Sequence, residues 1–77
     1  MNTTLVKKAV KEFLKDSTKN EKIVDWDIDP NTTSFESFYV SIITISKYHQ
    51  VWKHTMWVDE TDYNMITSYE VHLLSTI

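Results

Sequence analysis

The most apolar part of the chain alternates in a way that suits an extended backbone. Between residues 35 and 58 the β-branched and aromatic residues are concentrated, and their period of two predicts two long strands joined near residues 47–50. Apolar residues occupy both sides of the first strand, with Phe38, Val40 and Ile42 on one side and Tyr39, Ile43 and Ile45 on the other. We therefore expect one face of the sheet to be covered by a helix and the other to form a contact surface.

The second of these strands is apolar on both sides as well. Trp52, Met56 and Val58 share one side, while Val51 and Trp57 share the other. The connection contains no Asn-Gly or Asp-Gly pair, so the sequence leaves the hairpin register uncertain by a residue or two. Trp57 joins Tyr39 on one face only if that register allows it.

The N-terminal segment has the spacing of an amphipathic helix over about residues 4–15. Its apolar residues form one stripe: Leu5, Val6, Ala9, Val10, Phe13 and Leu14. The opposite side carries Lys7, Lys8, Lys11 and Lys15. Charged side chains normally stay in water, so we interpret these lysines as a solvated face, with contact to phosphates as the alternative.

Residues 21–29 alternate apolar and acidic positions. Val24, Trp26 and Ile28 fall on one side, and Asp25, Asp27 and Asp29 fall on the other. This pattern predicts a strand with one wet face. A row of like charges also suits an edge strand, because it discourages pairing with another chain.

The C-terminal segment, residues 63–77, fits two structures. A helix would align Ile66, Tyr69, Leu73 and Ile77, whereas a strand would align Met65, Thr67, Tyr69, Val71 and Leu73. Its β-branched residues favour the strand. The sequence thus predicts a single α+β domain, residues 1–77, with an N-terminal helix packed on an antiparallel sheet of three or four strands, in the order αβββ(β). The alternative order is αβββα.

The composition excludes several classes of protein. The chain has no glycine and no arginine, so it lacks both the glycine loops that hold nucleotides and the forked side chain that reads guanine. It has no cysteine and no long apolar run, from which we expect a cytoplasmic protein without a membrane segment. The net charge is −3, with the lysines concentrated in residues 1–22 and the acids beyond them, which argues against nucleic acid as a partner.

One acidic stretch matches the ligand spacing of a calcium loop. Asp25, Asp27, Asp29 and Glu36 stand at relative positions 1, 3, 5 and 12 of an EF-hand loop. Position 6, however, is Pro30, where the loop needs a turn with positive φ that proline cannot adopt. We interpret the stretch as a strand followed by a turn, and the three histidines also lack the spacing of zinc ligands. We expect neither a metal nor a cofactor.

Without a catalytic signature, the two-faced hairpin predicts a non-catalytic protein-binding module rather than an enzyme. Small acidic proteins of phages and mobile elements that inhibit a host protein, such as a defence nuclease, are the class we favour. The expected contact residues are Tyr39, Ile43, Ile45, Trp57, Asp59, Glu60 and Asp62. Self-association through the uncovered face predicts a homodimer. The alternative is a nucleic-acid-binding module that uses Lys7, Lys8, Lys11 and Lys15.

Overall fold

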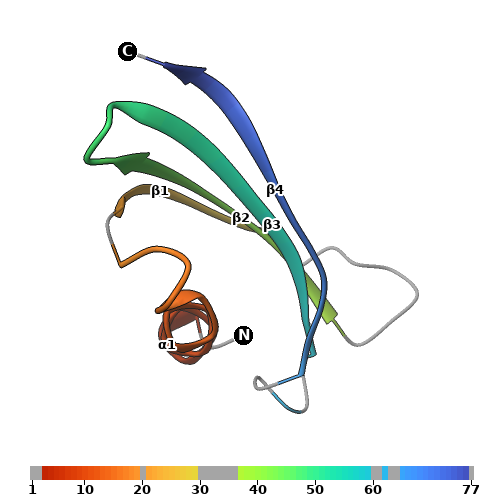
Figure 1. The fold of residues 1–77 in the computed structure, drawn as a ribbon. Helices are drawn as coiled ribbons and strands as arrows, with labels where there is room; N and C mark the ends of the chain where they lie inside the picture. Colours follow the sequence, from red (N-terminus) through yellow and green to blue (C-terminus); the bar gives the residue numbers. More distant parts are fainter. Residues whose placement is uncertain (1–2, 20, 30–36, 60–61, 63–64, 77) are drawn as a thin grey trace.

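The protein is one helix followed by a four-stranded antiparallel sheet. A computed structural model describes residues 3–19, 21–29, 37–59, 62 and 65–76. The elements are α1 (Thr3–Leu14), β1 (Glu21–Asp29), β2 (Ser37–Ser46), β3 (Gln50–Asp59) and β4 (Ile66–Thr76). The strands lie in the order β1-β2-β3-β4 (Figure 1). This confirms the αβββ(β) prediction with a fourth strand, and the αβββα alternative is wrong because β4 is extended.

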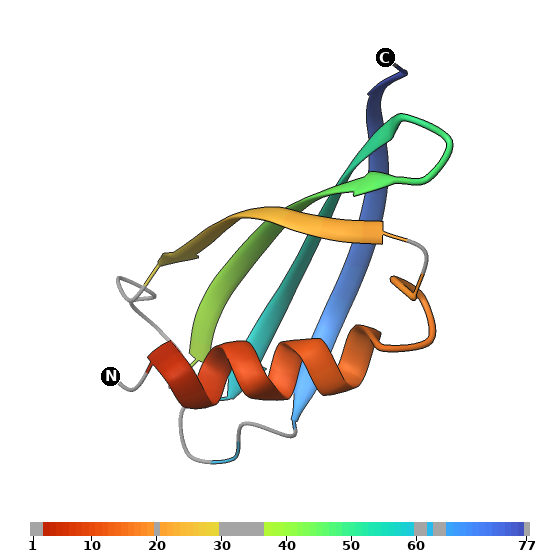
Figure 2. The same cartoon turned by 90° about the vertical axis from the view of Figure 1, so that its left-hand side faces the viewer.

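The helix α1 lies against the concave face of the curved sheet (Figures 1 and 2). Val6, Val10 and Leu14 recur every four residues, so they share one side of the helix, and all three are buried. They form the core together with residues of the two central strands: Phe38, Val40, Ile42, Met56 and Val58. The helix ends one residue before the predicted boundary, and the Thr18 N–H donates to the Leu14 carbonyl at 2.8 Å. The sequence offers Asn20 as a residue that could end the helix in the left-handed conformation, but Asn20 lies outside the described residues.

The hairpin between β2 and β3 turns without glycine. The His49 N–H donates to the Ser46 carbonyl at 3.0 Å, and His49 has a φ of 63°, in the left-handed region. The Ser46 hydroxyl oxygen accepts from the N–H groups of Tyr48 and Gln50, each at 3.2 Å. The resulting register puts Tyr39 directly opposite Trp57. The two rings therefore share one face of the sheet.

Strand β1 forms over the predicted residues, but its alternation is interrupted. Ile23 pairs with Thr44 and Asp25 pairs with Ile43, so Val24 is the extra residue of a β-bulge. The expectation that Val24 shares a side with Trp26 in the core is wrong: Val24 is exposed, and Ile23 packs against the core in its place. A bulge adds one residue to one strand, so it shifts the side-chain parity on either side of it.

Strand β4 contains a similar interruption at Ser68. Glu70 pairs with Thr55 and Thr67 with Trp57, so Ser68 and Tyr69 stand against one residue of β3. Ser68 has a φ of 54°. The predicted single row from Met65 to Leu73 is therefore broken, and Ile66 and Tyr69, three residues apart, both pack against the core. No helix among the described residues is long and apolar enough to span a membrane.

Candidate protein-binding face

The face of the sheet opposite α1 is built from cross-strand rows, and we call it the open face. The register and the alternation of side chains place four rows on it. From β1 to β4 the rows are Asp29-Tyr39-Trp57-Thr67, Asp27-Ser41-Thr55-Glu70, Asp25-Ile43-Lys53-His72 and Lys22-Ile45-Val51-Ser75. Four of the expected contact residues, Tyr39, Ile43, Ile45 and Trp57, thus lie together on the two central strands.

An aromatic pair occupies the first row. The ring centroids of Tyr39 and Trp57 are 5.1 Å apart with an angle of 57° between the planes. Such tilted pairs stabilise a sheet beyond the area that they bury. Both side chains remain half-buried without any cover from α1. The pair is a rigid, amphipathic contact element of the kind enriched in protein interfaces.

Small polar residues separate this pair from a second apolar group. Ser41 and Thr55 are only 8% and 5% exposed, because larger side chains stand on both sides of them along the strands. Beyond them lie Ile43, Ile45 and Val51, all half-buried. The open face therefore presents two apolar clusters with a polar row between them.

Acidic side chains border these clusters. Asp25, Asp27 and Asp29 follow the β1 flank, and all three are exposed. At the end of β3 the Asp62 N–H donates to Asp59 Oδ1 at 3.1 Å, so Asp59 binds Asp62 as well as adding charge. Glu60, the third expected acid of this turn, lies outside the described residues. The described acids place negative charge along one flank and at one end of the open face.

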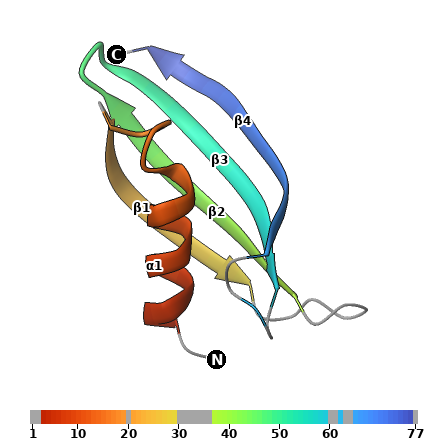
Figure 3. The same ribbon diagram turned by 60° about the horizontal axis from the view of Figure 1, so that its bottom comes forward.

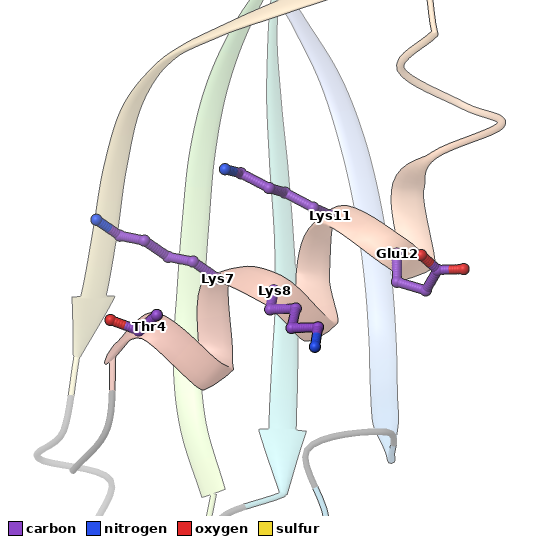
Figure 4. A pocket seen from close by; sticks show the side chains of 5 residues that line it. All are labelled: Thr4, Lys7, Lys8, Lys11 and Glu12. Atoms are coloured by element: carbon purple, nitrogen blue, oxygen red, sulfur yellow. The ribbon is translucent and has the colours of Figure 1, made fainter.

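The lysines of α1 lie on the other side of the molecule. Lys7, Lys8 and Lys11 line an open depression on the helix together with Thr4 and Glu12 (Figure 4). The Lys7 Nζ lies 5.5 Å from the centre of the Trp26 ring, in a cation–π contact. The Lys15 Nζ is 3.5 Å from Glu12 Oε1. Two of the four lysines of the alternative site thus have partners within the chain.

A buried polar network, which the sequence did not reveal, joins all four strands beneath the concave face. His54 of β3 is 2% exposed, and its Nε2 lies 3.1 Å from both Glu21 Oε1 and Thr44 Oγ1. Its Nδ1 lies 2.7 Å from the Tyr69 Oη. The Thr44 hydroxyl donates a short hydrogen bond to the Glu21 carboxylate. One residue from each strand therefore contributes to the network.

One arrangement of protons gives every atom of the network a partner. With the ring proton on His54 Nε2, that nitrogen donates towards Glu21 and Thr44, while Nδ1 accepts from the Tyr69 hydroxyl. Burial, together with the negative charge of Glu21, raises the pKa of Tyr69 above its ordinary value, which keeps this donor protonated. No buried side-chain nitrogen or oxygen among the described residues lacks a partner. The network therefore links all four strands through hydrogen bonds between side chains.

The network had only a weak signal in the sequence. Thr44 and His54 stand at positions whose parity points to the core, where an apolar residue is normal. Their partners Glu21 and Tyr69 come from β1 and β4, and only the sheet order brings them together. The described part of the chain contains no cluster of three His, Asp or Glu that would hold a metal. The stretch that resembled a calcium loop is β1 itself, and Pro30 and Glu36 lie outside the described residues.

Neither the family models, nor the curated proteins, nor the solved structures contain a match to this chain.

Proposed function

We propose that the protein is a non-catalytic module that binds another protein through its open face. The observation that carries this proposal is the placement of Tyr39, Trp57, Ile43 and Ile45 on a sheet face that no element covers among the described residues. A sheet face that meets only water normally alternates to polar residues at such positions. The contact would bury the two apolar clusters and leave the polar row between them.

The carboxylates along the β1 flank of the open face indicate the chemistry of the partner. Asp25, Asp27 and Asp29 form a flank of three carboxylates, which complements a surface rich in lysine and arginine. Enzymes that act on nucleic acids carry such surfaces, since they must contact phosphates. The partner that fits is therefore a basic protein, and an inhibitor of a nuclease is the form of this function that we favour.

The proposal also concerns the kind of genetic element that encodes the protein and the compartment in which the protein acts. The small acidic chain fits a protein of a phage or mobile element that acts on a host protein. The chain contains no cysteine, as is common in reducing compartments, and we propose that it acts in the cytoplasm.

The nucleic-acid alternative has less support in the structure. A phosphate-binding face needs several free cations, yet Lys7 contacts Trp26 and Lys15 pairs with Glu12. Gel shifts at low salt test this alternative, and a shift that disappears in a variant with Lys8→Gln and Lys11→Gln would favour it over the protein partner.

Affinity capture with matched variants tests the protein partner. Tagged wild type should retain one protein in a stoichiometric amount, and Ile43→Lys should lose it, because a second lysine beside Lys53 then replaces a central apolar contact. Lys8→Gln, on the helix, is the control that should retain it. The captured protein is then purified, and its nuclease activity is measured against increasing amounts of wild type and Ile43→Lys.

Two results would contradict the proposal. Equal capture by wild type and Ile43→Lys, with both folded by circular dichroism, would remove the open face from the contact. Capture without any change in the activity of the partner would leave protein binding intact and overturn the inhibitor role.

A further inference from the structure

The apolar side chains on the C-terminal half of β4 are more exposed than those at the centre of the open face. Val71, Leu73 and Leu74 are 44%, 49% and 53% exposed, whereas the apolar residues at the centre of the open face are half-buried. Figure 2 shows the reason: α1 crosses β4 near its beginning, and the C-terminal half of the strand extends beyond the helix. Every residue from Glu70 to Thr76 is exposed.

The outer edge of β4 lacks the protection that β1 has. Both strands are edges of the sheet (Figure 3). β1 carries three aspartates, whose like charges oppose pairing with another strand, while β4 carries only Glu70 and His72 as charged or weakly basic groups. From Glu70 to Leu73 the strand is regular, between bulges at Ser68 and Leu74. An exposed edge with so few charges tends to pair with another chain.

We propose that β4 pairs with the β4 of a second copy of this chain, antiparallel about a two-fold axis at Val71. A two-fold axis relates a strand to itself residue by residue, so it must pass beside one residue. Centred on Val71, it sets Glu70 opposite His72 of the second copy, and His72 opposite Glu70. A centre on Glu70 or on His72 would instead set like groups against each other.

The side chains on both faces of β4 are compatible with this register. Glu70 and His72 lie on the open face, as their pairing with Thr55 and Lys53 shows, and within one copy His72 Nε2 is 3.8 Å from Glu70 Oε2. Val71 and Leu73 point to the helix side. In the pair Val71 meets itself and Leu73 meets Tyr69, so exposed apolar surface is buried on one face, while a carboxylate meets an imidazole on the other.

The β4 dimer does not depend on the proposed inhibitor role. It uses an edge of the sheet, whereas the sequence predicted a homodimer through the open face. The axis is perpendicular to the sheet, so both open faces lie on the same side of one eight-stranded sheet. Dimerisation through β4 therefore leaves both open faces free.

Single cysteines test the register directly, because the chain has no cysteine of its own. In Val71→Cys the two thiols face each other across the axis, about 5 Å apart between Cβ atoms, so mild oxidation should give a disulfide-linked dimer. In Leu74→Cys, an equally exposed site, the thiols are about 20 Å apart along the antiparallel pair and should not react. Equal cross-linking at both sites, or none at Val71→Cys, would overturn the proposed register.

Sedimentation tests the interface without cross-linking. Val71→Lys should abolish the dimer, since two lysines then meet at the axis. His72→Glu places two carboxylates opposite each other at both of the Glu70 contacts and should weaken the dimer about tenfold, and adding Glu70→Lys should restore it. A wild type that remains monomeric at millimolar concentration would refute the proposal. So would a dimer that Ile43→Lys abolishes and Val71→Lys leaves intact, which would assign self-association to the open face.

Discussion

Replacement of His54 by leucine should cost a large share of the stability of this protein. Leucine is of similar size, so the change removes the two ring nitrogens without leaving a large cavity. Glu21 then loses one of its two partners and Tyr69 loses its acceptor, while Thr44 can still donate to Glu21. A hydrogen bond to a charged group contributes about 1.5–3 kcal/mol and a neutral one about 1 kcal/mol, so we expect a loss of about 2–4 kcal/mol.

Thermal unfolding followed by circular dichroism measures this loss. In a domain of this size 1 kcal/mol corresponds to about 4–8 °C, so Tm should fall by roughly 8–32 °C. The control is His72→Leu, the same chemical change at an exposed site, measured at low protein concentration, and it should alter the stability by less than about 0.5 kcal/mol. If His54→Leu unfolds within a few degrees of wild type, the network does not stabilise the sheet and the reasoning fails.

Two further predictions concern charge. Folding raises the pKa of Tyr69, so the unfolded state loses the hydroxyl proton of Tyr69 first as the pH rises. The contribution of Tyr69 to the stability is therefore fully present below pH 10.0, the ordinary pKa of tyrosine, and is lost above it. Urea unfolding between pH 9 and 12 should therefore show a steeper decline for wild type than for Tyr69→Phe, and parallel curves would contradict this. Replacing Asp25 and Asp27 by asparagine removes charges that oppose pairing of the β1 edge, so light scattering at high concentration should increase. The control, Glu12→Gln with Asp16→Asn, changes the net charge equally on exposed residues and should not increase the scattering.

The sequence predicts the elements well because each has a local cause. The stripe that contains Val6, Val10 and Leu14 requires a helix, and the acidic alternation of residues 21–29 requires a strand with one wet side. The positions of the helix and of β1 agree with the prediction to within one residue at each end. The strand form of residues 66–76 also followed from its β-branched residues.

The bulges and the buried network could not be predicted in the same way, because they depend on contacts between strands. Whether Val24 or Ile23 faces the core is decided by the pairing with β2, and a bulge at Ser68 becomes visible only against β3. In the sequence His54 has no feature that distinguishes it from other strand residues, because its partner Glu21 is 33 positions away. Similarly, the placement of Trp57 beside Tyr39 needed the hairpin register, which a turn without glycine does not reveal.

The contrast between the two sheet edges limits what the protein can assemble into. Pairing that uses β4 in both copies is isologous, so it closes after two chains, whereas pairing of β4 with β1 would repeat without end. The aspartates of β1 oppose this second mode. The charges that border the open face would thus have two effects: they attract a basic partner, and they restrict sheet growth to a dimer. A dimer with both open faces on one side would hold a partner that offers two sites more tightly than either face alone.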